Sequence, residues 1–208
     1  MASILILFAH PVLEKSRVHK TLLKQLKGVP GITLNDLYEH YPDFDIDVPR
    51  EQELLLRHDI IVWQHPLYWY SSPALLKQWQ DLVLEHGWAY GSKGRQLEGK
   101  KLFSVLSSGG SMEAYGPGGT NRYSLQDLLH PFEQTARLCR MTYWPPFWVA
   151  STHKMEQPQI DASAHQYLQV LTALRDGLVQ EEELLHMNCL NQLFPIEKNR
   201  AGLGVQGH

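Results

Sequence analysis

The stretch Ile4-Leu5-Ile6-Leu7-Phe8-Ala9, followed directly by His10-Pro11, decides the fold. A continuous apolar run rich in branched side chains is typical of a strand that is buried on both faces, as in a parallel sheet. Pro11 ends the strand, because proline has no backbone N–H to donate to a neighbouring strand. Residues 4–9 therefore predict a buried strand, and the chain leaves the sheet at His10.

Beyond this first strand, apolar strands alternate with stretches of helical periodicity. The other predicted strands span residues 32–37, 60–64, 101–106 and 143–149, the last one interrupted by Pro145-Pro146; helices are predicted after Ser16, over residues 51–57, after Pro73, and over residues 125–138 and 159–178. This alternation predicts an α/β fold with an open parallel sheet and helices on both faces. Five strands favour the flavodoxin-like order 2-1-3-4-5 over the six-stranded dinucleotide-binding fold, and no G-x-G-x-x-G motif follows the first strand.

The regular pattern weakens after about Glu181. A length of 208 residues fits one domain, or one domain and a tail. The sequence therefore predicts a flavodoxin-like domain over residues 1–180 and a C-terminal tail over residues 181–208, which we expect either to wander or to pack on a partner.

Composition narrows the class of protein further. A net charge of −3 argues against nucleic acid as the main partner, because phosphate binding needs a basic stripe. Cys139 and Cys189 are too few for a disulfide framework and lack the spacing of metal ligands, which favours a reducing compartment. The histidines show no H-E-x-x-H pattern, and the first apolar run is too short for a signal peptide or a membrane span. We therefore expect a cytoplasmic protein without a metal site.

The predicted topology also places a ligand site. In open α/β sheets, ligands bind outside the carboxyl ends of the strands at the switch point, which here means the loops after strands one, three and four. The first of these loops leads into a helix N-terminus, whose free N–H groups and partial positive charge attract a phosphate. Ser16 and Arg17 lie at that helix start. The alternative is that Ser16 serves only as a helix cap.

The other two loops suit a flat ring. Leu67 is followed by the aromatic run Tyr68-Trp69-Tyr70, which would form a wall for an isoalloxazine ring; the alternative is an aromatic cluster that packs under the sheet. The run Ser107-Ser108-Gly109-Gly110 would let the backbone approach a planar ligand, although by itself it could be a plain turn. The three loops together, each after the appropriate strand, favour a binding site.

Long motifs in this order resemble the flavodoxin-like NAD(P)H:quinone oxidoreductases, and within them the ancillary subunits of bacterial glutathione-regulated potassium-efflux systems. The resemblance covers about residues 3–178. The motifs that carry it are Ala9-His10-Pro11, residues 64–77, Gly87-Trp88-Ala89-Tyr90-Gly91, Gly99-Lys100 and Ser107-Ser108-Gly109-Gly110, with residues 37–47, Asn121-Arg122-Tyr123, Pro131-Phe132-Glu133 and Cys139-Arg140-Met141 for the closer group.

The resemblance implies bound FMN and a role for each motif. The FMN phosphate would be held by His10, Ser16, Arg17, Val18 and His19, and the ring would be lined by Leu67, Tyr68, Trp69, Tyr70, Ser107, Ser108, Gly109 and Gly110. The family often has Asn where His19 stands. Tyr115 matches a catalytic tyrosine by its spacing from Gly109-Gly110, whereas the position of the family's catalytic histidine falls near Asn121.

The implied activity is hydride transfer from NADH or NADPH to the flavin, and then to a quinone-like acceptor at the same place, which means ping-pong kinetics. The efflux subunits imply a homodimer on the cytoplasmic face of the inner membrane, bound to a potassium-efflux antiporter. The aromatic residues of segments 143–148 and 87–90 would then be buried by the partner subunit, or else in the chain's own core. Two rival functions are a regulatory subunit whose redox activity is secondary and an electron carrier without an NAD(P)H site.

Overall fold

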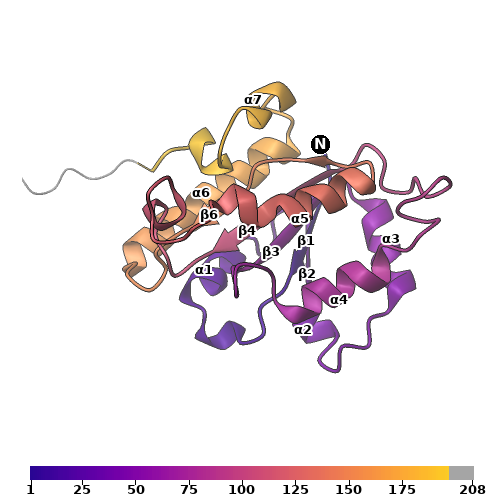
Figure 1. Ribbon diagram of the computed structural model, residues 1–208, viewed down its shortest axis with the longest axis horizontal. Helices are drawn as coiled ribbons and strands as arrows, with labels where there is room; N and C mark the ends of the chain where they lie inside the picture. The colour runs from indigo at the N-terminus through magenta and orange to yellow at the C-terminus, as the bar shows by residue number, and fades with distance from the viewer. Residues whose placement is uncertain (197–208) are drawn as a thin grey trace, which may run out of the picture.

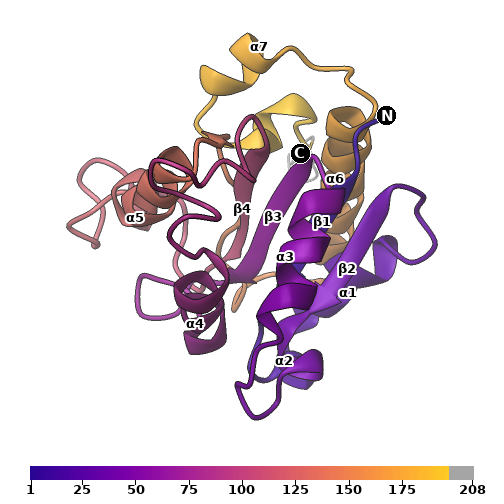
Figure 2. The same cartoon turned by 90° about the vertical axis from the view of Figure 1, so that its right-hand side faces the viewer.

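The computed structural model describes residues 1–196, which fold as a parallel sheet between two layers of helices (Figures 1 and 2). The strands are β1 (Ile4–Phe8), β2 (Ile32–Asp36), β3 (Ile60–Pro66), β4 (Lys101–Ser107), β5 (Thr142–Tyr143) and β6 (Phe147–Val149). They are ordered β2-β1-β3-β4-β5, with β6 also on β4. The predicted flavodoxin-like order 2-1-3-4-5 is confirmed.

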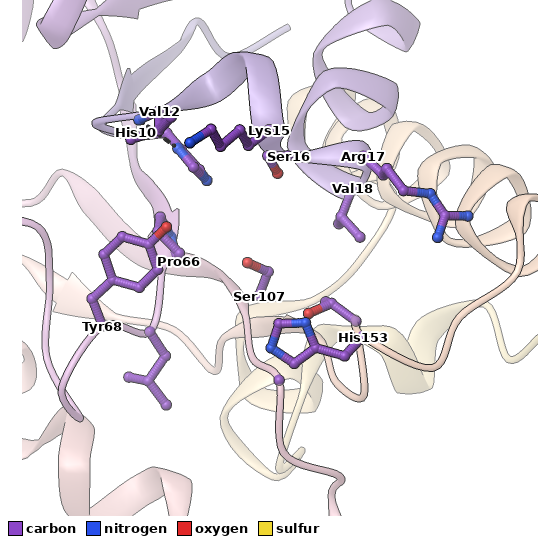
Figure 3. A pocket seen from close by; sticks show the side chains of 13 residues that line it. His10, Val12, Lys15, Ser16, Arg17, Val18, Pro66, Tyr68, Ser107 and His153 are labelled. Atoms are coloured by element: carbon purple, nitrogen blue, oxygen red, sulfur yellow. Dashed lines mark hydrogen bonds between the residues drawn. The ribbon is translucent and has the colours of Figure 1, made fainter.

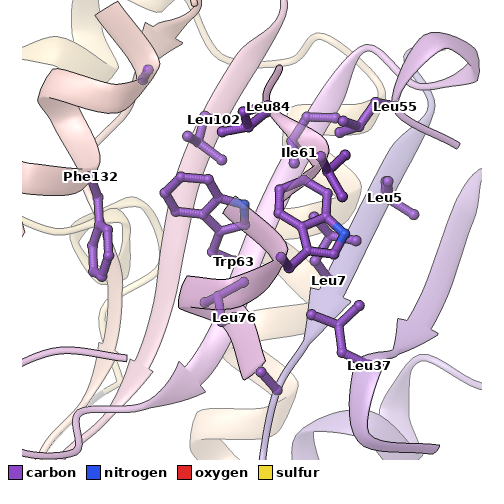
Figure 4. Packing of buried hydrophobic residues seen from close by; sticks show 14 of the residues in the cluster. Leu5, Leu7, Leu37, Leu55, Ile61, Trp63, Leu76, Leu84, Leu102 and Phe132 are labelled. Carbon is purple, nitrogen blue, oxygen red and sulfur yellow. The ribbon is translucent and has the colours of Figure 1, made fainter. Parts of the chain in front are cut away.

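Strand β1 lies between β2 and β3 and is buried on both faces. Ile4 is in register with Ile32 on one side and with Ile60 on the other. Side chains alternate across a strand, so Leu5 and Leu7 enter one hydrophobic cluster while the residues between them enter the other. Figure 4 shows the first of these clusters. The strand order reverses between β1 and β3, because β2 lies on one side of β1 and β4 lies beyond β3 on the other, so the carboxyl end of β1 is at the switch point.

The helices divide between the two faces. Helices α1 (Arg17–Gln25) and α6 (Gln157–Arg175) cover the face to which β1 presents Ile4, Ile6 and Phe8. The other face is covered by α2 (Leu37–His40), α3 (Val48–Arg57), α4 (Ala74–Val83) and α5 (Leu125–Leu138). Short 3₁₀ segments lie at Leu13–Lys15, Glu113–Tyr115 and Leu190–Leu193. Helices on both faces are as the sequence predicts.

The fifth strand position differs from a single strand over residues 143–149. Two short strands, β5 and β6, both pair with β4 in parallel. Pro145 and Pro146 lie between them and have no N–H to donate, so the ladder is interrupted there. Trp144 still donates its backbone N–H to the Leu102 oxygen at 2.8 Å, which keeps the segment against β4.

Residues 181–196 of the predicted tail pack on the rest of the chain. The tail begins with α7 (Glu181–Leu185), where Glu181 accepts hydrogen bonds from Lys101 Nζ and Trp144 Nε1 at 2.7 and 3.1 Å. Leu184 and Leu190 are buried. These contacts are long-range and the two leucines do not form a periodic pattern, so the sequence gives little sign of them. Residues 197–208, the rest of the predicted tail, lie outside the described residues.

Within residues 1–196, every helix is too short or too polar to cross a membrane. No group of three His, Cys, Asp or Glu side chains there comes together as ligands of a metal ion would.

Candidate functional site

A cavity of about 430 Å³ lies at the carboxyl ends of the central strands (Figure 3). Its lining includes eight of the predicted site residues: His10, Ser16, Arg17, Val18, Leu67, Tyr68, Ser107 and Gly109. Val12, Lys15, Pro66, Thr152 and His153 complete it. The predicted residues His19, Trp69, Tyr70, Ser108, Gly110 and Tyr115 do not line it. The three predicted loops therefore do meet, and a fourth loop joins them.

One wall of the cavity is the first turn of α1. The Ser16 backbone N–H donates to the Leu13 oxygen at 2.9 Å, and the His19 N–H donates to Ser16 Oγ at 3.1 Å. Within residues 1–196, the N–H groups of Arg17 and Val18 have no hydrogen-bond partner. Two free donors and the positive end of the helix dipole thus face the cavity, as an anion site requires.

Ser16 is confirmed as the cap of α1, but this does not use up its hydroxyl group. The Oγ atom accepts from His19, while its own proton stays available for another acceptor. Capping and ligand binding are therefore compatible at this residue. The ammonium group of Lys15 adds positive charge to the same wall.

His10 enters the cavity as a neutral hydrogen-bond donor. Its Nδ1 accepts from the Val12 N–H at 3.2 Å, so the proton of the neutral ring is on Nε2. Burial lowers the pKa of His10, and nearby Glu14 opposes this only in part. The ring also packs edge-on against Tyr68, with 5.9 Å between the ring centres.

His19 lies beneath the cavity rather than in its wall. Its side chain is fully buried, with Nε2 2.9 Å from Ser107 Oγ and Nδ1 3.3 Å from Gln64 Nε2. Desolvation holds its pKa well below the ordinary histidine value, and the neighbouring His10 and His65 rings lower it further. The imidazole therefore lies under Ser107, outside the cavity lining.

The aromatic loop is a tight turn with two strained residues at its tip. Tyr68 and Ser71 bond to each other through both backbone pairs, at 3.1 and 2.9 Å. Trp69 and Tyr70 between them have φ of 49° and 63°, a left-handed conformation that bulky residues rarely adopt. Trp69 is consequently 94% exposed, which excludes the alternative that it packs under the sheet. Tyr68 and Tyr70 are also partly exposed.

The loop after β4 closely approaches the side chain of His153. A Cβ atom on Gly109 would lie 2.5 Å from the His153 ring. Ser108 is buried and bonded through its Oγ to the Gly110 oxygen and to Trp148 Nε1, both at 2.9 Å. The loop is therefore packed tightly against the segment after β6, where His153 enters the cavity lining.

Tyr115 stands beside the cavity without lining it. Its ring packs edge-on against Trp148, with 5.5 Å between ring centres, and a Cβ on Gly110 would be 3.0 Å from it. Burial raises the pKa of its hydroxyl, and the nearby Tyr70 hydroxyl raises it further. The Tyr115 ring thus lies next to Gly110, outside the cavity lining.

Comparison with known proteins identifies the family. A protein family described as having a flavodoxin-like fold matches residues 2–171 of this chain. The chain belongs to this flavodoxin-like family. A glutathione-regulated potassium-efflux system ancillary protein (KefG) of Enterobacter sp. (strain 638) is 49% identical over 162 residues, which make up 78% of this chain and 88% of that protein. The resemblance drawn from the motifs is confirmed.

Solved structures agree with this assignment. General stress protein 14 from Treponema denticola, solved in complex with FMN, has a TM-score of 0.79 and 42% identity, with 83% of this chain and 99% of that chain covered. An NADPH-quinone reductase from P. pentosaceus has a TM-score of 0.73 and 34% identity, with 80% of this chain and 96% of that chain covered.

Two of the lining residues that sequence reasoning missed, Thr152 and His153, come from the loop after β6. Thr152 donates its backbone N–H to the Ser108 oxygen at 3.0 Å, and His153 packs on Gly109. No motif marks these two residues. Their position does follow from the strand order, because the fifth strand lies next to the fourth and their carboxyl ends meet at one edge of the sheet.

Proposed function

We propose that this protein is an FMN-dependent NAD(P)H:quinone oxidoreductase. The observation that carries the proposal is the cavity at the switch point. Its lining includes the free N–H groups of Arg17 and Val18 and further hydrogen-bond donors. The relatives support it, since one solved structure is a complex with FMN and another is named an NADPH-quinone reductase. The acceptor would be a quinone-like small molecule.

The cavity fits FMN chemically at both of its ends. The phosphate would be held by the N–H groups of Arg17 and Val18 and by the Ser16 hydroxyl, with Lys15 balancing its charge. Leu67, Tyr68, Ser107 and Gly109 offer a mixed apolar and polar lining for the ring. When bound, FMN supplies the hydride chemistry, accepting from NADH or NADPH and donating to the acceptor in a ping-pong sequence.

The chain's own residues would bind, orient and supply protons. Neutral His10 donates from Nε2 into the cavity. A tyrosine hydroxyl is already protonated at neutral pH, and burial raises the pKa of Tyr115 further. A protonated hydroxyl beside the ring site would hydrogen-bond the carbonyl oxygen of a quinone-like acceptor. We therefore assign Tyr115 as the proton donor at the acceptor's carbonyl.

A visible spectrum of the purified protein tests the proposed function. We expect the bands of bound oxidised flavin, the release of FMN on denaturation, and bleaching by NADH or NADPH that a quinone reverses. Protein reconstituted with excess FMN that shows neither the bound-flavin bands nor bleaching would contradict the proposal.

Replacing Trp69 by alanine tests the aromatic wall. Trp69 is almost fully exposed, so we expect little change in the melting temperature. If the indole covers the flavin ring, FMN affinity should fall about three- to tenfold, the equivalent of about 0.5–1.5 kcal/mol for an aromatic contact. Titration of the apo-protein with FMN measures this, with Trp69→Phe as the matched control that keeps a ring. An unchanged affinity and flavin spectrum in Trp69→Ala would remove Trp69 from the site.

A second candidate function is a regulatory one. The relative at 49% identity is named an ancillary protein of a glutathione-regulated potassium-efflux system. By that likeness, this chain would sit at the cytoplasmic face of the inner membrane on a potassium-efflux antiporter, with redox activity secondary. Potassium efflux distinguishes the regulatory role from the enzymatic one. It is measured with the wild-type protein and with a variant that binds FMN but does not accept hydride. Equal efflux would favour the regulatory role.

The proposed oligomeric state is a two-fold homodimer. The segments that first suggested it are largely covered by the chain itself: Trp144, Phe147 and Trp148 are buried, and Trp88 and Tyr90 pack on the core. The exposed aromatics are instead Tyr68, Trp69, Tyr70 and Tyr123. We expect light scattering at micromolar concentration to give about twice the chain mass of 23.9 kDa. A monomer that still turns over NAD(P)H would contradict the dimer.

A further inference from the structure

A buried chain of hydrogen bonds runs from the core to the floor of the cavity. It begins at Tyr167 on α6, whose hydroxyl is 2.9 Å from Gln64 Oε1 at the end of β3. Gln64 Nε2 is 3.3 Å from His19 Nδ1, and His19 Nε2 is 2.9 Å from Ser107 Oγ. The first three side chains are fully buried, and Ser107 lines the cavity. Four elements, α6, β3, α1 and β4, each contribute one member.

The donors and acceptors in this chain of hydrogen bonds can be oriented in only two ways. In the observed arrangement Tyr167 donates to Gln64 Oε1, and the Gln64 amide donates to His19 Nδ1. The proton of neutral His19 must then be on Nε2, which donates to Ser107 Oγ. The Ser107 hydroxyl already accepts one bond here, so its own proton is free to point into the cavity. In the reverse orientation, the Ser107 hydroxyl would donate its proton to His19 Nε2 and would have none to offer to the cavity.

Tyr167 decides between the two directions. Within residues 1–196, Gln64 is the hydrogen-bond partner of its hydroxyl. Were the Gln64 amide flipped, Tyr167 would become an acceptor and its own buried proton would be left without a partner, which costs about 1–3 kcal/mol. The neutral state of His19 that this argument needs follows from its complete burial, which also lowers its pKa.

We propose that Tyr167, Gln64 and His19 are positioning residues that hold the Ser107 hydroxyl as a hydrogen-bond donor to the bound ligand. The floor of the cavity then selects a ligand that presents an acceptor there, such as a carbonyl or phosphate oxygen, and disfavours one that presents an N–H group. For the identity of that ligand, the inference rests on the proposed function, in which it belongs to FMN.

The direction of the chain is measured first on protein without flavin. The ¹⁵N shifts of the His19 ring in the apo-protein should show the proton on Nε2 in the wild type. In Tyr167→Phe, which keeps the ring but removes the donor, we expect a mixture of the two tautomers. Tyr143→Phe is the matched control, because its hydroxyl bonds to Ser104 at 2.8 Å, outside the chain of hydrogen bonds. A proton on Nδ1 in the wild type, or an unchanged ring in Tyr167→Phe, would overturn the proposal.

FMN binding gives the second readout. We expect Tyr167→Phe to weaken FMN about two- to tenfold in the wild-type background, and to have no effect when Ser107 is already alanine. Equal effects in both backgrounds would mean that Tyr167 acts only through general packing, and would overturn its positioning role. If no variant binds FMN, the proposed function fails, whereas the apo-protein tautomer still tests the chain of hydrogen bonds.

Discussion

Replacement of Glu51 by alanine is expected to lower the free energy of unfolding by about 3–5 kcal/mol, out of the roughly 5–15 kcal/mol typical of a domain. The Glu51 side chain on α3 is fully buried. Its Oε1 accepts from the Tyr41 hydroxyl at 2.7 Å, and its Oε2 accepts from Asn35 Nδ2 and Trp79 Nε1, both at 2.8 Å. Arg50 also bonds to Oε1. Alanine would leave three buried donors without their acceptor.

Chemical denaturation of the two proteins measures this effect. Glu53→Ala is the matched control, because Glu53 lies on the same helix and pairs with Arg57 where both side chains are mostly exposed. We expect that change to stay within about 0.5 kcal/mol. If Glu51→Ala costs no more than Glu53→Ala, the buried carboxylate does not hold β2, α3 and α4 together.

Ser16→Ala is expected to weaken FMN binding by roughly 10–100-fold, the equivalent of about 1.5–3 kcal/mol for a hydrogen bond to a charged phosphate oxygen. The same change removes the cap of α1, which should lower stability by about 1 kcal/mol. Titration of the apo-protein with FMN, together with its melting curve, separates the two effects.

The matched control for Ser16 is Ser124, which caps α5 in the same way by accepting from the Asp127 N–H at 3.1 Å. Ser124 is not part of the cavity lining. Ser124→Ala should therefore lose a similar amount of stability while keeping the wild-type affinity for FMN. If Ser16→Ala behaves in the same way, Ser16 is a cap and no more.

The sheet could be predicted because its central strands are buried on both faces. Residues 4–9 and 60–63 are apolar without alternation, and such segments predict interior strands even without any tertiary information. The fifth strand position was harder, because Pro145-Pro146 breaks the apolar run while β4 still holds both halves. The packing of residues 181–196 depends on single distant contacts, which leave no local periodicity.

The candidate site was predicted to the extent that backbone topology determines it. The strand order brings the loops that contain His10, Tyr68 and Ser107 together, and all three residues line the cavity. Loop motifs do not predict whether a side chain lines the cavity or is buried beneath it. His19 lies three residues before Leu22 on the apolar face of α1, so the helical spacing points it into the core, where both of its nitrogens are satisfied.

The turn between Tyr68 and Ser71 gives up conformational stability in order to expose two aromatic side chains for recognition. Asn-Gly is the sequence that such a turn prefers, because those residues adopt positive φ at little cost. This chain places Trp69 and Tyr70 there instead, at a penalty of the order of 1 kcal/mol or more for each. Selection for thermal stability alone would replace both aromatic residues. Their presence therefore indicates that recognition at this surface is favoured over the stability of the loop.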